Sequence, residues 1–180
     1  MAVGFLSPTT YATGLTLISS TAFSGATTQS FGSDASPIFT SAYRNYRIII
    51  DNLKNATASQ ELKFRLRANT TDLTSGVYNY QATYMIGSTI GGSRTGGATS
   101  TVIGTTTTET QSGAFVFDIT NPQTAIRKNI ISSGVVYEPG DGIRMFLYDS
   151  LISDTGSYNG FTIFATNNIS GNISIYGYDI

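Results

Sequence analysis

Apolar and polar residues alternate along much of the chain, and this two-residue period is typical of half-buried β-strands. The clearest example is residues 61–68, where Leu62, Phe64, Leu66 and Ala68 share one face and charged residues occupy the other. Further segments alternate in the same way or are rich in β-branched and aromatic residues: 13–23, 77–84, 113–120, 124–133, 143–149, 160–166 and 172–178. These segments predict an all-β protein.

Short runs of Gly, Pro, Asn and Asp separate the strands, and no segment of helical length repeats its apolar residues every three to four positions. Many strands with frequent turns predict an antiparallel, jelly-roll-like β-sandwich with an extended N-terminal leader. We expect residues 1–40 to be an N-terminal arm, or a first strand plus a long loop, and residues 41–180 to form the sandwich domain. The Thr- and Gly-rich residues 87–110 predict a mobile hairpin or long loop, with 105–110 as an exposed strand.

The segment from Tyr43 to Leu53 reads YRNYRIIIDNL and predicts a central strand. Its three consecutive isoleucines place apolar side chains on both faces, as expected where a second layer covers the sheet. Arg44 and Arg47 lie at the polar start of this strand, where a guanidinium reaches the rim while its stem packs. We expect Arg47 to pair with Asp51.

Composition limits the chemistry that the chain can perform. The 180 residues include no cysteine and no histidine, which excludes disulfides, zinc sites built on Cys or His, and Ser-His-Asp catalysis. Most carboxylates sit at turns, and nothing in the sequence singles out a facing pair. We therefore expect no enzymatic activity, no catalytic or metal-binding residues and no cofactor.

The charge content narrows the range of partners. Charged residues make up 12% of the chain and the formal net charge is −1, so the strong basic field of a nucleic-acid-binding protein is missing. No apolar run is long enough for a transmembrane helix. Neither nucleic acid nor a membrane is expected as a partner.

The basic residues nevertheless cluster along the chain. Six of the ten lie in two neighbouring predicted strands, and a hairpin across residues 54–60 would place their outward side chains in one positive stripe. This stripe would suit an acidic protein surface, or it is an ordinary solvated face that Asp51 and Glu61 partly neutralise. The six residues are Arg44, Arg47, Lys54, Lys63, Arg65 and Arg67, and all except Lys54 are taken as candidate partner-binding residues.

Tyrosines form a second candidate surface. The segment VYNYQATY places Tyr78, Tyr80 and Tyr84 on one face of an extended chain. Tyrosine offers a rigid amphipathic contact area, as in sugar sites and antibody paratopes. The alternatives are packing at a sheet edge or a subunit interface, or binding of a glycan.

Four segments in a fixed order resemble tailed-bacteriophage virion proteins: SAYRNYRIIIDNL, LKFRLRANTTDLTSGVYNYQ, FDITNPQTAIRKNIISSG and GFTIFATNNISGNISIYGYDI. The shared pattern is a tyrosine-led strand after a leader, a short l-x-l-R strand, a Y-x-Y element, an N-P turn and a closing s-G-x-i-s-i-Y-G strand. The resemblance covers most of Tyr43 to Ile180, and the order of the segments carries it.

The resemblance implies a jelly-roll or related β-sandwich, often trimeric and without catalytic residues, of the kind found in head-decoration (cement) proteins and tail-fibre tips. Because the chain shows neither heptads nor a repetitive shaft, we expect a decoration protein that binds the major capsid protein or other virion proteins as a homotrimer. Its expected location is the virion, after assembly in the host cytoplasm. The alternative is a tail-associated adaptor or receptor-binding tail-fibre protein that contacts a host-surface glycan.

Overall fold

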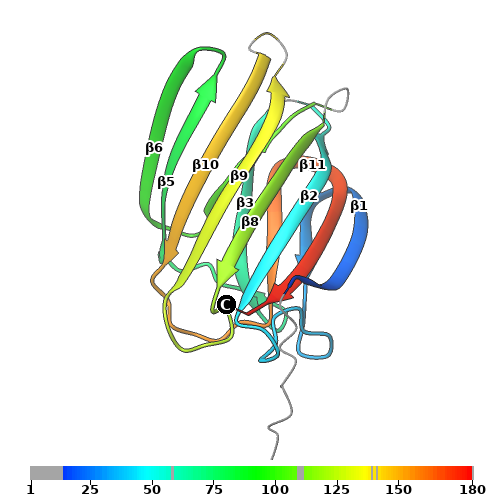
Figure 1. The fold of residues 1–180 in the computed structure, drawn as a ribbon, viewed down its shortest axis with the longest axis vertical. Helices are drawn as coiled ribbons and strands as arrows, with labels where there is room; N and C mark the ends of the chain where they lie inside the picture. Colours follow the sequence, from blue (N-terminus) through cyan, green and yellow to red (C-terminus); the bar gives the residue numbers. More distant parts are fainter. Residues whose placement is uncertain (1–13, 58, 109–111, 139, 141, 180) are drawn as a thin grey trace, which may run out of the picture.

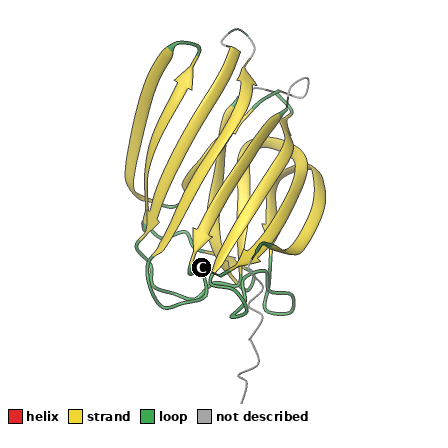
Figure 2. Cartoon of the chain, in the orientation of Figure 1, coloured by secondary structure: helices red, strands yellow, loops and turns green. Residues whose placement is uncertain are grey.

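The computed structural model describes residues 14–57, 59–108, 112–138, 140 and 142–179, and every regular element in these ranges is a β-strand (Figure 2). No helix that could cross a membrane is found in this part of the chain. The strands are β1 Thr16–Phe31, β2 Asn45–Asn55, β3 Gln60–Ala68, β4 Thr71–Asp72, β5 Tyr78–Ile86, β6 Thr89–Ala98, β7 Thr101–Thr106, β8 Gly113–Thr120, β9 Lys128–Glu138, β10 Gly142–Ile152 and β11 Gly160–Tyr178. The predicted all-β class is confirmed.

All named strands belong to one antiparallel sheet that curls into a half-barrel (Figure 1). The order along the sheet is β4-β3-β11-β2-β8-β9-β10-β5-β6, with β1 added to β11 and β7 added to β3. Curling lets one part of the sheet cover another, so an inner surface is buried without any helix.

Strand β11 connects the two layers of this half-barrel. Its first half, Gly160–Phe164, pairs with β3, and its second half, Ile169–Tyr178, pairs with β2. Strand β1 follows the other edge of β11 through both halves. In Figure 1 the β1–β11 ribbon bends from the rear layer, with β3, to the front layer, with β2 and β8.

This arrangement corrects two expectations. Strands β2 and β3 do not form a hairpin, because both run antiparallel to β11 and lie end to end along it. Residues 160–178 form one bent strand in place of two strands joined by a turn, and the pairing of β11 with β2 shifts register between Ser170 and Asn172. A bulge of this kind bends a strand without ending it.

The core between the layers centres on Phe161 of β11. Its ring centroid lies 5.0 Å from that of Phe31, 5.5 Å from Phe64, 5.7 Å from Phe39 and 6.3 Å from Phe117. These rings come from both layers, so the aromatic cluster holds the half-barrel closed. The central-strand prediction for residues 43–53 agrees with β2, which has neighbours on both sides and buries Tyr46, Ile48 and Ile50.

The Thr- and Gly-rich segment differs most from its prediction. Residues 89–98 form β6, and residues 101–106 form β7, in which every residue is buried. Strand β7 contacts the opposite layer, where the hydroxyls of Thr101 and Ser150 form a hydrogen bond and Ser132 donates to the carbonyl of Ile103. The expected exposed strand at 105–110 is therefore wrong for Thr105 to Thr107, which are buried, while residues 109 and 110 lie outside the described ranges.

The N-terminal region contains a strand where it is described. Residues 16–31 form β1, and residues 32–44 connect it to β2. The remainder of the predicted leader, residues 1–13, lies outside the described residues. One smaller prediction is wrong: Ala68, placed on the buried face of its strand, is exposed.

Replacing Gly104 with alanine tests the close approach of β7 to the opposite layer. The added Cβ would lie 2.5 Å from Cε1 of Phe115 and 3.2 Å from Cζ of Phe146, and such overpacking costs about 1–3 kcal/mol of unfolding free energy. Urea unfolding measures the loss. The control Gly14→Ala, whose Cβ would meet no atom within 4 Å, should change stability by about 0.5 kcal/mol or less. Equal stability of the two variants would contradict this packing.

Candidate functional site

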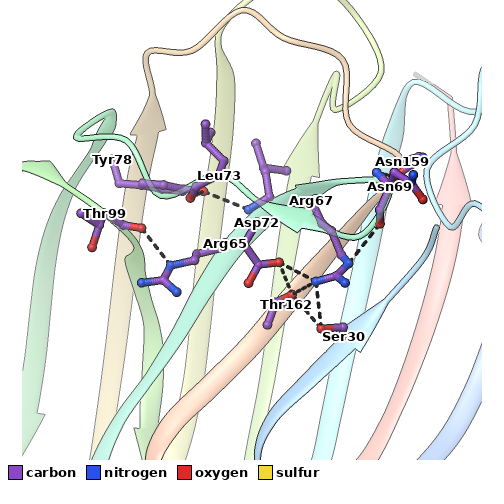
Figure 3. Close-up of polar contacts among 11 residues, drawn as sticks. Ser30, Arg65, Arg67, Asn69, Asp72, Leu73, Tyr78, Thr99, Asn159 and Thr162 are labelled. Carbon is purple, nitrogen blue, oxygen red and sulfur yellow. Dashed lines mark hydrogen bonds and ion pairs between the residues drawn. The ribbon is translucent and has the colours of Figure 1, made fainter. Parts of the chain in front are cut away.

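The first candidate residue, Arg67, lies in a polar network on the outer side of β3 (Figure 3). Its Nη1 is 2.7 Å from Oδ1 of Asp72 and also donates to the hydroxyls of Ser30 and Thr162, while Nε donates to the carbonyl of Asn69 at 3.1 Å. Thr162 donates to the same Asp72 oxygen at 2.7 Å. The guanidinium therefore joins β1, β3, β4 and β11, and its charge is balanced within the chain.

Arg65 and Lys63 are the neighbouring candidates on β3. The Arg65 guanidinium lies 4.4 Å from the centre of the Phe164 ring, a cation–π distance, and its Nε donates to the carbonyl of Thr99 at 3.0 Å. Lys63 pairs with Glu61 at 3.3 Å. Both cations keep solvent contact, but each already has a partner in its own sheet.

The two arginines at the start of β2 differ from one another. Arg47 forms a two-pronged ion pair with Asp118 of β8, at 2.9 and 2.7 Å, and not the predicted pair with Asp51. The hydrogen bond to Asp118 raises the pKa of Arg47 above its usual value. Arg44 has an exposed side chain, while its backbone N–H donates to Oδ1 of Asp179 at 2.7 Å.

The single positive stripe predicted from the basic cluster does not form. Because β2 and β3 pair with different halves of β11 and not with each other, the arginines of these two strands are not cross-strand neighbours. Carboxylates or rings on other strands engage Arg47, Arg65 and Arg67, and Lys63 pairs with Glu61 of its own strand. Arg44 is the candidate with the most open side chain.

The three candidate tyrosines share one face of β5, as predicted, but that face points into the half-barrel. Tyr78 is fully buried; its hydroxyl accepts from the N–H of Leu66 at 2.9 Å and donates to the carbonyl of Leu73 at 3.1 Å (Figure 3). Tyr80 lies 6.3 Å from the Tyr148 ring, and the Arg144 guanidinium lies 5.0 Å from the ring centre of Tyr84. These rings pack inside the fold, and burial raises the pKa of Tyr78.

A buried cation that the sequence gave no reason to single out joins two loops. Lys128 is fully buried, and its Nζ donates to the carbonyls of Thr124 at 3.0 Å, Ile126 at 2.6 Å and Gly156. The Tyr158 ring lies 5.2 Å from Nζ. Burial lowers the pKa of Lys128. The three carbonyls replace its hydration shell, so the residue links the chain before β9 to the β10–β11 connection.

Strands β9, β10, β5 and β6 expose a large group of apolar side chains on the surface that faces away from the core. We call this surface the outer apolar face. Cross-strand pairing places Val135 beside Met145, Met145 beside Met85, and Met85 beside Ile90. The next row contains Leu147, and Tyr137 pairs with Ile143. Its nine members are 37–73% exposed: Met85, Ile90, Ile131, Val135, Tyr137, Ile143, Met145, Leu147 and Leu151.

The strands of the outer apolar face lie side by side on the left of Figure 1: β9, β10, β5 and β6. At one end of the face lies a groove of about 820 Å³ whose exposed lining is mainly apolar. Its residues include Ile131 and Leu151 together with Asn79, Gln81, Arg94, Asn129 and Asp149. A second hollow of about 420 Å³ lies between Ile49, Val116, Val135 and Met145. The surface is therefore suited to docking in both chemistry and shape.

Sequence reasoning missed this face, although it left a signal. In the segment IRMFLYD the outward positions are apolar, with Ile143, Met145 and Leu147, and the inward Phe146 between them is apolar too. A strand with apolar residues on both faces normally packs against other structure on both sides. The folded chain covers the inner side of this strand and leaves the outer side exposed.

Neither a search for metal-binding groups nor a comparison with known proteins assigns a function to these surfaces. Within the described ranges, no three His, Cys, Asp or Glu side chains gather as a metal-binding group. Comparisons with protein-family models, with curated proteins and with solved structures found no match.

Removing the carboxylate partner of Arg67 should be costly. The Arg67 and Asp72 side chains are 16% and 19% exposed, so Asp72→Ala leaves a poorly hydrated cation and should lower unfolding free energy by about 1–3 kcal/mol. Glu61→Ala breaks the Lys63 pair, whose side chains are 39% and 53% exposed, and should cost about 0.5 kcal/mol or less. Chemical denaturation of both variants measures the difference, and equal losses would refute the network's structural role.

Stability should fall at alkaline pH because buried tyrosines resist ionisation. The unfolded chain releases its tyrosine protons near pH 10.0, whereas the folded chain retains those of tyrosines with raised pKa values, so unfolding becomes easier above pH 10. Lys128 acts in the opposite direction, since its folded pKa lies below 10.5. Phenolate absorbance during titration should show a late group that ionises with unfolding; one common transition in the folded protein would contradict this. The group is Tyr46, Tyr78, Tyr148, Tyr158 and Tyr178.

Proposed function

We propose that this protein is a non-enzymatic structural component of a tailed-bacteriophage virion, a decoration or cement protein that binds and stabilises the capsid shell. The observation that carries the proposal is the outer apolar face, because it indicates a protein that works inside an assembly. The sequence resemblance supplies the kind of assembly. Binding, rather than chemistry on a substrate, is the function that this geometry supports best.

The size of the face supports an assembly role. If a fully exposed residue of this size presents about 200 Å², the nine exposed fractions together leave about 900 Å² of residue surface in water. The largest apolar patch of a typical monomer is about 300–600 Å². A sheet face larger than this normally has a protein partner.

The charge pattern refines how the shell would be contacted. Since ion pairs engage Arg47, Lys63 and Arg67, these residues would not attract an acidic shell as free cations. Arg44, exposed next to β2, is the better candidate for a polar contact with the major capsid protein or other virion proteins. Apolar burial would then supply most of the assembly energy, with the homotrimer predicted from the resemblance as the assembling unit.

A tail-associated, receptor-binding role is the second candidate, and the polar side chains in the groove at the end of the outer apolar face favour it. The amides of Gln81 and Asn129, together with Arg94 and Asp149, are groups that bind sugar hydroxyls. Under this alternative a host-surface glycan occupies the groove.

Addition of the purified protein to capsids that lack it should discriminate between the two functions. A decoration protein should bind bare heads in a fixed stoichiometric ratio and raise the temperature at which they break, measured by sedimentation and by thermal disruption. Binding to host cells but not to heads would favour the tail role. Failure to bind heads would refute the decoration proposal.

A further inference from the structure

We infer that a second copy of this chain covers the outer apolar face, so that the protein self-associates through β9, β10, β5 and β6. The inference deepens the proposed function and rests on it in one respect, since both require the face to be covered. It adds the surface through which the copies meet, which the homotrimer expected from the resemblance leaves open.

The area of the face matches what self-association needs. A stable interface of standard size buries about 800 Å² on each partner, and the nine residues leave about 900 Å² exposed. The apolar rows around Met145 and Leu147 are bordered by polar side chains such as Gln81 and Asn129. An apolar centre with a polar rim is the usual composition of a protein interface.

The charges on the face favour a copy of itself over a strongly charged partner. Among the described outward residues of β9, β10, β5 and β6, two carry a charge at neutral pH, Asp149 and Arg94, and their signs are opposite. Both pair across the sheet with Gln81, one on each side. When two copies meet, the same charges are present on both of them. Because the charges of this face cancel within each copy, the two copies do not repel each other overall. An acidic or basic partner would find no complementary field there.

The shape of the face also provides both halves of a contact. Ile90 is 73% exposed and Ile143 is 60% exposed, so both side chains project from the sheet. The hollow of about 420 Å³ beside Val116 and Met145 is lined mainly by apolar residues. In a closed ring of three copies, the projecting side chains of each copy meet the hollow of the next, which is how interface anchors and pockets pair.

Light scattering on the purified full chain tests the inference, together with a matched pair of variants. The wild-type mass should be a multiple of the 19.1 kDa of one chain, and three times that mass for the expected trimer. A double variant, Met145→Lys with Leu147→Lys, should fall to the mass of one chain while keeping its far-ultraviolet circular dichroism. The control Leu17→Lys changes a β1 residue that is 55% exposed, close to the 53% of Met145, and should keep the wild-type mass.

Each outcome bears on the inference. A wild-type mass of one chain at about 100 μM, or loss of association in Leu17→Lys but not in the double variant, would overturn it. If the double variant does not fold, Ile90→Lys on the edge strand β6 replaces it, with the same expected dissociation. The head-binding experiment separates the two proposals: a monomer that binds heads overturns self-association alone, and an oligomer that ignores heads overturns the decoration role alone.

Discussion

The fold depends on one constraint: β11 forms hydrogen bonds with two different neighbours on the same edge. Its first half pairs with β3 and its second half with β2, while β1 follows the other edge throughout. The bend between the halves brings one layer of the sheet over the other, and in this way the described strands bury a core between them. The cluster around Phe161 then joins the layers from within. Without this bend, the inner residues of β2, β3 and β8 would face water.

The same curvature explains how a protein with few charges uses them. Curling leaves the outer side of β3 and β2 solvated, and the cations there are engaged by neighbours on adjacent strands, as with Arg67 and Asp72 or Arg47 and Asp118. Lys128 is the exception, because it is buried and backbone carbonyls surround it. Charge therefore serves mainly to join strands and loops. The large apolar side chains on the outer side of β9 and β10 stay exposed.

Local sequence pattern was enough to predict strands and their buried faces. The alternation in residues 61–68 and 113–120 identified the inward side chains of β3 and β8, because a two-residue period is a property of the extended backbone itself. Pattern could not predict which strands pair, so the hairpin between β2 and β3 and the positive stripe were wrong. The burial of β7 was also missed. Thr and Gly look like loop residues in sequence, yet here they allow a close approach to Phe115 that larger residues would block.

The candidate site shows a similar division. Tyr78, Tyr80 and Tyr84 were placed correctly on one face, but the sequence alone does not say whether that face is turned inward or outward. The outer apolar face was missed because the pattern of residues 143–149 predicts a strand but does not say whether both of its apolar sides are covered within one chain. The cation of Lys128 was unpredictable, since its three carbonyl partners come from loops whose paths depend on the whole sheet.

The pairing of β1 with β11 also affects how the protein is made. Residues 16–31 leave the ribosome early, but their partners at 160–178 follow only on the order of ten seconds later at ordinary rates of translation. During that interval the inner face of β1 and the edge of β2 have no partner, and the closing bend does not yet exist. Folding is thus expected to be concerted and late, with a high contact order and slow closure. A nascent chain of this kind must be kept from its neighbours on the polysome until the last long strand emerges.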